Sequence, residues 1–182
     1  MIDVDGDGLA DQAWITGGSD RTFGITTASG ATFSTAITSA SPVPASAVVG
    51  LVQGDQPIAL VDVGREALLF SLDGCQVTAP ADAQGTAYTF DRGLAGEGTG
   101  VGCSEDGSTL RLAGLNAVQA TDGTYTVTRT YVDLSSDGRT ATNGAKSTVA
   151  TNAAATEAVV TTAQEVSCGD AVAGVDGPVE PS

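Results

Sequence analysis

The feature that most constrains this fold is the alternation of short β-branched runs with Gly and Asp turn signals. Val, Ile and Thr favour extended backbone, whereas Asp-Gly pairs are typical of the tight turns that join antiparallel strands. Such pairs occur at Asp73–Gly74, Asp106–Gly107, Asp122–Gly123 and Asp137–Gly138. The pattern predicts strands over residues 12–16, 21–27, 31–37, 47–53, 58–63, 67–72, 75–78, 110–113, 116–120 and 125–134. We therefore expect an all-β protein built from antiparallel strands.

Helix is expected to be minor. Asn152 could cap a helix through the alanines that follow it, but the Val and Thr content after Ala158 favours a strand. Further short edge strands are expected at 139–141 and 147–150. No helix should exceed about two turns.

The strand groups recur along the chain at intervals of about 45 to 50 residues, a period typical of β-propeller blades. Ile15, Leu60 and Leu110 hold equivalent places in three units, at about residues 1–45, 46–100 and 101–168. In the middle unit residues 68–70 are consecutively apolar, which predicts a strand covered on both faces. Propellers typically need about four to eight blades to close. Three units therefore predict blade-like sheets in a partial propeller, and a β-sandwich is the alternative.

The two ends of the chain differ from this β region. Residues 169–182 are acidic and contain Gly and Pro, which predicts a disordered tail after a single β domain at 1–168. At the other end an acidic loop follows almost directly after Met1. We therefore expect the chain to be part of a longer protein, with any export signal outside it.

The acidic loop carries the sharpest chemical signal. Asp3, Asp5 and Asp7 occupy alternate positions separated by Val and Gly, and Asp11 follows soon after. In a calcium loop these are ligand positions one, three, five and nine, and the backbone carbonyl of Leu9 supplies position seven. Alternate spacing lets a tightly curled backbone direct short carboxylates at one hard cation. The loop therefore predicts one Ca²⁺ held by Asp3, Asp5, Asp7, Leu9 and Asp11.

The loop differs from an EF-hand, and a simpler interpretation exists. Position twelve is Trp14 instead of a bidentate Glu, and a strand follows where an EF-hand has a helix. Trp14 is expected to pack in the core behind the loop. Asp-Gly pairs alone could also mark ordinary hairpin turns. Four carboxylates within nine residues would nevertheless repel one another strongly without a counter-ion, which favours the calcium interpretation.

Charge excludes several classes of partner. The formal net charge is −15 at pH 7, and the seven basic residues are scattered singly. Nucleic-acid phosphates and anionic membrane surfaces would be repelled, so neither is expected as a partner. No apolar run is long enough to cross a bilayer, and membrane insertion is not expected.

The composition also limits catalysis. The chain contains no histidine, so a Ser-His-Asp or Cys-His apparatus is impossible. The remaining acidic residues form no recognisable catalytic arrangement. We expect no enzymatic activity.

Three cysteines could form at most one disulfide within the chain. Cys75 and Cys103 flank turns and bracket the loosely patterned middle of the sequence. A Cys75–Cys103 bridge would tie down a segment with little core of its own. Cys168 would then be free or paired outside this chain. The alternative is three buried free thiols in a cytosolic protein.

The loop Asp3-Val4-Asp5-Gly6-Asp7-Gly8-Leu9-Ala10-Asp11, with the apolar strand after it, resembles the FG-GAP/VCBS-type repeat of integrin α-like β-propellers. In that family the aspartates and one carbonyl bind calcium at the blade edge. The resemblance covers the start of the chain, and the other two units match only in the spacing of their strand groups. The segments around Cys75 and Cys103 also resemble secreted proteins of high-GC bacteria that carry such repeats.

The resemblance implies a calcium-binding, non-catalytic domain at an extracellular or cell-surface location. Its role would be structural, or it would bind a protein or glycan ligand at its surface. The alternative is an ancillary domain of a secreted enzyme whose catalytic part lies outside this chain.

Overall fold

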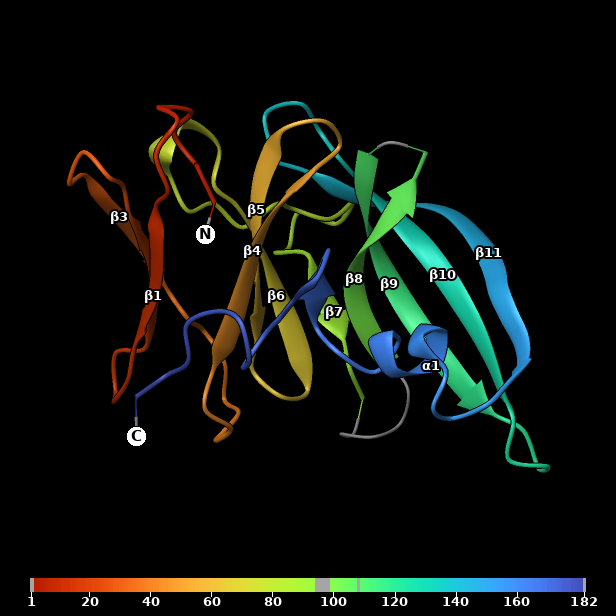
Figure 1. Ribbon diagram of the computed structural model, residues 1–182. Helices are drawn as coiled ribbons and strands as arrows, with labels where there is room; N and C mark the ends of the chain where they lie inside the picture. Colours follow the sequence, from red (N-terminus) through yellow and green to blue (C-terminus); the bar gives the residue numbers. More distant parts are fainter. Residues whose placement is uncertain (1, 94–98, 108, 182) are drawn as a thin grey trace.

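The computed structural model, which describes residues 2–93, 99–107 and 109–181, contains three large antiparallel sheets in chain order (Figure 1). A small fourth sheet pairs β12 with β13 near the C-terminus. The first sheet has the order β1-β2-β3, the second β4-β5-β6-β7 and the third β11-β10-β9-β8. Short turns join most strands to their neighbours in sequence, and a longer connection that contains η1 joins β6 to β7. The expected all-β class and antiparallel pairing are confirmed.

The bounds of the elements follow the turn signals. The strands are β1 (Gln12–Thr16), β2 (Thr22–Thr26), β3 (Thr32–Ala36), β4 (Ser46–Val52), β5 (Gln56–Asp62), β6 (Glu66–Ser71), β7 (Thr89–Asp91), β8 (Thr99–Asp106), β9 (Thr109–Gln119), β10 (Tyr125–Leu134), β11 (Ala141–Ala153), β12 (Ser167–Cys168) and β13 (Ala171–Val172). A 3-10 turn η1 spans Asp73–Cys75, and α1 spans Ala158–Thr162. Within the part of the chain that the structure describes, no helix is long and apolar enough to cross a membrane.

The hairpin between β9 and β10 shows how the Asp-Gly signals act. Gly123 takes a φ of 87°, in the left-handed region that glycine tolerates best. The Asp122 carboxylate accepts hydrogen bonds from the backbone N–H of Thr124 at 3.0 Å and from its hydroxyl at 2.7 Å. The expected turn at Asp122–Gly123 is therefore present, and side-chain bonds close it.

The second sheet is buried on both faces, as its continuous apolar runs predict. In β5 the alternate residues Ala59 and Val61 face the first sheet, and Ile58 and Leu60 face the third. Phe70 stacks on Phe23 of β2 with ring centroids 6.1 Å apart. Full burial of side chains of this size contributes about 1.5–3 kcal/mol each. These two core layers join the three sheets into one face-to-face stack.

The outer face of the third sheet is covered by α1. Val160 and Ala163 pack there against Val127 and Tyr131 of β10. The helix lies in the segment where sequence favoured a strand, but its five residues agree with the expectation of no helix longer than about two turns. Burial of one apolar edge decides the conformation here, because tertiary contacts override weak propensity.

The three large sheets pack on one another in chain order, but they do not close a ring or barrel in the described part of the chain. Each sheet lies in one of the three expected units, except that β8 starts at Thr99, slightly before the third.

The C-terminal segment packs on the sheets, in contrast to the expected disordered tail. The backbone N–H of Ala47 bonds to the carbonyl of Pro178 at 3.0 Å, and that of Glu180 to the carbonyl of Ala45 at 2.8 Å. In Figure 1 this blue segment runs from the third sheet past β4 towards β1. The free edge of β4 offers unpaired backbone groups, and the segment satisfies them despite its Gly and Pro content.

Candidate metal centre

The acidic loop leads directly into β1 and is closed at its base. Ile2 pairs with Asp11 in an antiparallel bridge, and the Asp11 N–H bonds to the Ile2 carbonyl at 2.8 Å. Between them the backbone curls through Gly6 and Gly8, with φ values of 76° and 84°. These left-handed conformations explain why glycine stands at both positions. In Figure 1 the loop is the red turn at the upper end of β1.

The Asp3 carboxylate organises the curl from inside. One of its oxygens accepts the N–H of Gly6 at 2.7 Å and that of Asp7 at 3.2 Å. The other accepts the N–H of Gly8 at 2.8 Å. A carboxylate has about four acceptor sites, so these bonds leave capacity for a cation.

Asp11 ties the loop to the rest of the first sheet. Its side chain is only 3% exposed. One carboxylate oxygen accepts the N–H of Val4 at 2.7 Å, and the other accepts the N–H of Ala28, in the turn between β2 and β3, at 2.9 Å. These bonds to backbone donors offset the cost of burying the charged group.

Three of the four predicted carboxylates converge. Asp3, Asp5 and Asp11 each offer an oxygen, and these oxygens lie within 4.8 Å of one another. Asp3 is half-buried and Asp5 is exposed, so the group is open to solvent on one side. Carboxylate oxygens are the ligands that Ca²⁺ prefers, and one open side leaves space for water or further oxygen ligands. The residues present therefore fit a hard divalent cation.

Asp7 stands apart from this group. The Asp7 carboxylate accepts the N–H of Leu9 at 2.8 Å, which makes a local turn, and Asp7 does not belong to the converging set. The role predicted for Leu9 belongs to its backbone carbonyl and stays a prediction. Of the four predicted carboxylates, the structure thus assembles three and leaves Asp7 as a turn-forming residue.

Electrostatics in the group favour a counter-ion. The pKa of Asp5 is raised, first by partial desolvation and also by the neighbouring charges of Asp7, Asp11 and Asp3. The N–H of Asp7 acts in the opposite direction through a hydrogen bond. A bound cation would remove the mutual repulsion that raises this pKa.

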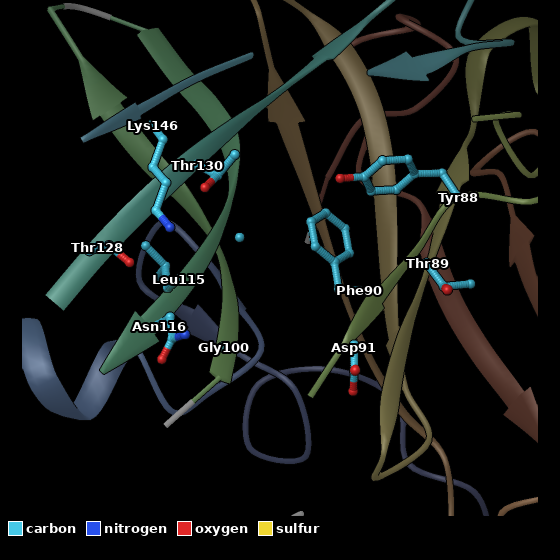
Figure 2. A pocket seen from close by; sticks show the side chains of 11 residues that line it. Tyr88, Thr89, Phe90, Asp91, Gly100, Leu115, Asn116, Thr128, Thr130 and Lys146 are labelled. Atoms are coloured by element: carbon cyan, nitrogen blue, oxygen red, sulfur yellow. The ribbon is translucent and has the colours of Figure 1, made fainter. Parts of the chain in front are cut away.

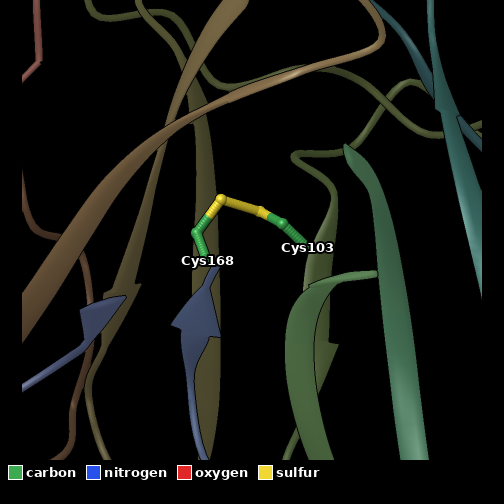
Figure 3. The surroundings of a disulfide bond; sticks show 2 residues. All are labelled: Cys103 and Cys168. Carbon is green, nitrogen blue, oxygen red and sulfur yellow. A yellow bond between two sulfur atoms is a disulfide. The ribbon is translucent and has the colours of Figure 1, made fainter. Parts of the chain in front are cut away.

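The expected Cys75–Cys103 disulfide is wrong, because the bridge joins Cys103 to Cys168 (Figure 3). Cys75 is free and exposed in η1. Cys168 lies beside Cys103 because the segment before β12 runs along β8, where the Val101 N–H bonds to the Glu165 carbonyl at 2.9 Å. The prediction relied on the positions of Cys75 and Cys103 on either side of the loosely patterned middle. Those positions give no sign of the contact between Cys103 and Cys168, which are 65 residues apart in sequence.

Gly50 on β4 is a structural partner of the disulfide that sequence reasoning missed. A Cβ at this position would collide with the Cys168 sulfur, and the Cys103 sulfur lies 3.9 Å from the same point. A glycine inside an expected strand was the available signal, because such a glycine often marks a close approach.

Comparisons with protein-family models, with curated proteins and with solved structures found no match to this chain.

Proposed function

We propose that this chain is a calcium-binding, non-catalytic β domain of an extracytoplasmic protein. The observation that carries the proposal is the convergence of the Asp3, Asp5 and Asp11 carboxylates in a loop whose backbone donors already hold two of them in place. The resemblance of the loop to FG-GAP/VCBS-type repeats agrees with this proposal.

The role proposed for calcium is structural. Asp11 links the loop to the β2–β3 turn through Ala28, and Asp3 fixes the curl through Gly6 and Gly8. An ion shared by Asp3, Asp5 and Asp11 would hold these connections together and neutralise their repulsion. Ion binding would then stabilise the first sheet by mass action, by about 2.7 kcal/mol at 100 times the dissociation constant.

The proposed location rests on the disulfide. The Cys103–Cys168 bridge is compatible with an oxidising, extracellular compartment. The net charge of −15 also agrees with a domain that does not bind nucleic acid, because phosphates would be repelled. A catalytic role has no support from composition, because the chain lacks histidine.

The test is calcium titration of the wild type and of Asp5→Ala. Asp5 is the converging acid with the least structural role, since among the described residues its carboxylate accepts one backbone bond, from Asp7 at 3.2 Å. We expect wild-type protein to bind one Ca²⁺ by calorimetry and to melt at a higher temperature in millimolar calcium than in chelator. Asp5→Ala should lose both effects.

Asp20→Ala is the matched control, since Asp20 is an exposed acid beyond the other end of β1 and outside the group. It should keep the calcium response in full. Equal melting temperatures of the wild type in calcium and in chelator, with no heat of binding, would show that the loop is only an acidic turn.

A further inference from the structure

A second site lies between β7 and the third sheet, with no lining residue from the first sheet (Figure 2). Its cavity volume is about 230 Å³. Tyr88 and Phe90 form one wall, and Asn116, Thr128, Thr130 and Lys146 line the opposite side. The first side also includes Thr89 and Asp91 and is called the aromatic wall for its two rings, and the opposite side is called the polar wall.

Strand register creates the polar wall. Thr130 of β10 is paired with Gly114 of β9 on one side and with Lys146 of β11 on the other. Thr128 is paired with Asn116 in the same way. Leu112 and Val132 belong to the same strand faces and pack in the core between the second and third sheets. The face is thus apolar where the sheets touch and becomes polar where they diverge.

The aromatic wall is held in place. Tyr88 and Phe90 pack edge to face with centroids 5.2 Å apart, and the Tyr88 hydroxyl donates to Oδ1 of Asn143 at 2.6 Å. Burial raises the pKa of Tyr88, so the hydroxyl stays a neutral donor. Gly114 faces the Phe90 ring, and a Cβ there would lie 3.6 Å from it. The absence of a side chain at Gly114 therefore keeps the space beside the ring open.

The polar wall has unused hydrogen-bonding capacity. Among the residues the structure describes, every ion pair uses arginine, so Lys146, the single lysine of the sequence, has no carboxylate partner there. The side chains of Asn116, Thr128 and Thr130 likewise form no hydrogen bond within residues 2–93, 99–107 and 109–181. Hydrogen-bond donors and acceptors without a partner in the described part of the chain therefore face the aromatic wall across a small cavity.

We propose that this pocket binds one neutral sugar residue of a glycan. A pyranose presents C–H faces that suit aromatic rings, and a rim of hydroxyls that can bond to amide, hydroxyl and ammonium groups. A few placed polar groups beside apolar surface are typical of small-molecule sites, and this cavity is small enough for a single ring. The net charge of −15 disfavours anionic ligands despite Lys146. The proposal is independent of the calcium site.

NMR titration of the ¹⁵N-labelled full chain tests this proposal. The probes are the methyl glycosides of glucose, galactose, mannose and N-acetylglucosamine, with methyl glucuronide as the anionic comparison and glycerol as a plain polyol. We expect saturable shifts of amides in β7, β9, β10 and β11 with at least one neutral glycoside, and a dissociation constant on the order of 1 mM. Glycerol and the glucuronide should give no saturable shift. The same titration in chelator should give the same result, which separates this site from the calcium loop.

Two variants locate the binding. Asn116→Ala and Lys146→Ala change exposed residues and should each weaken binding about tenfold, with an unchanged fold by circular dichroism. Thr126→Ala, an exposed change on β10 outside the pocket, should bind as the wild type does. The proposal is overturned if no neutral glycoside gives saturable shifts, if the glucuronide binds better, or if both pocket variants bind normally.

Discussion

Asp5 and Asp11 carry the same charge in the same loop, yet they have different surroundings. Asp11 is buried and bonded to Val4 and to Ala28, whereas Asp5 is exposed with a single backbone donor. The spacing of the aspartates predicted four converging carboxylates, and three of them converge, because this part of the loop depends on local geometry. It could not predict the Asp11–Ala28 bond, since the pairing of β1 with β2 brings Ala28 to the loop.

Trp14 differs from its expected place in the core. Its neighbours Ala13 and Ile15 face the second sheet, so Trp14 lies half-buried on the outer face of β1. There the indole lies over Gly24 of β2, and its Nε1–H donates to the Thr26 hydroxyl at 3.0 Å. Strand alternation sets which face the side chain takes, and the register with Gly24 leaves room for the ring.

Gly24→Ala is expected to move this indole into solvent. The new Cβ would collide with the six-membered ring of Trp14, which can swing outward because the outer face is open. The single tryptophan of the chain should then show a red-shifted emission maximum, with a loss of unfolding free energy of no more than about 1–3 kcal/mol. Fluorescence and urea unfolding measure the two effects. Unchanged emission would contradict the stacked arrangement.

Whole elements were predictable where their signals are local. The strand expected at 12–16 is β1, and the one expected at 31–37 contains β3. The two short edge strands expected at 139–141 and 147–150 are instead one bent strand, β11. Its Thr, Asn, Ala and Lys side chains are mostly exposed on both faces, so no apolar alternation marks its length.

The C-terminal segment is held by an ion pair that composition could not reveal. The Glu180 carboxylate accepts the Arg21 Nε–H and the Ala45 N–H, both at 2.8 Å, and both side chains of the pair are mostly buried. Arg21 also donates to the carbonyls of Ser41 and Val43. These contacts are long-range, so the acidic and Gly/Pro-bearing composition was misread as disorder.

Glu180→Ala is expected to lower the unfolding free energy by about 1–3 kcal/mol, because the Arg21 charge and the Ala45 N–H lose their acceptor. Denaturant unfolding measures this loss, and hydrogen exchange at Ala45 should accelerate. Asp170→Ala, a change at an exposed acid of the same segment, is the control and should stay within about 0.5 kcal/mol of the wild type. Equal stability of the two variants would argue against the Glu180 contact.

At the scale of the molecule, the period of about 45 to 50 residues corresponds to three sheets, each a meander packed on the next. The period of the sequence indicates repeated units, but it does not indicate whether the sheets close into a ring. Ring closure depends on how many units are present and on the angle between them. The second sheet was identifiable as the central layer from its consecutive apolar residues. The path of the C-terminal segment across the sheets was not, since its contacts are with residues far away in sequence.

The Cys103–Cys168 bridge attaches the C-terminal segment to the third sheet. Loss of this bridge should affect the molecule as a whole. The closed loop spans 65 positions, which corresponds to about 4 kcal/mol in the chain-entropy model. Replacing both residues by Ala should lower the unfolding free energy by up to this amount. It should also accelerate hydrogen exchange at Ala47, whose N–H bonds to Pro178 beyond the bridge.

Cys75→Ser is the matched control, because Cys75 is exposed and free. It should leave both measurements unchanged, since no bond and no buried surface are lost. Peptide mapping without reductant should recover Cys103 linked to Cys168 and Cys75 as an alkylated thiol. A recovered Cys75–Cys103 peptide would instead require β8 to separate from the segment before β12, because Cys103 cannot hold both partners. Cys75→Ser would then lower the unfolding free energy too, because it would remove the partner of Cys103.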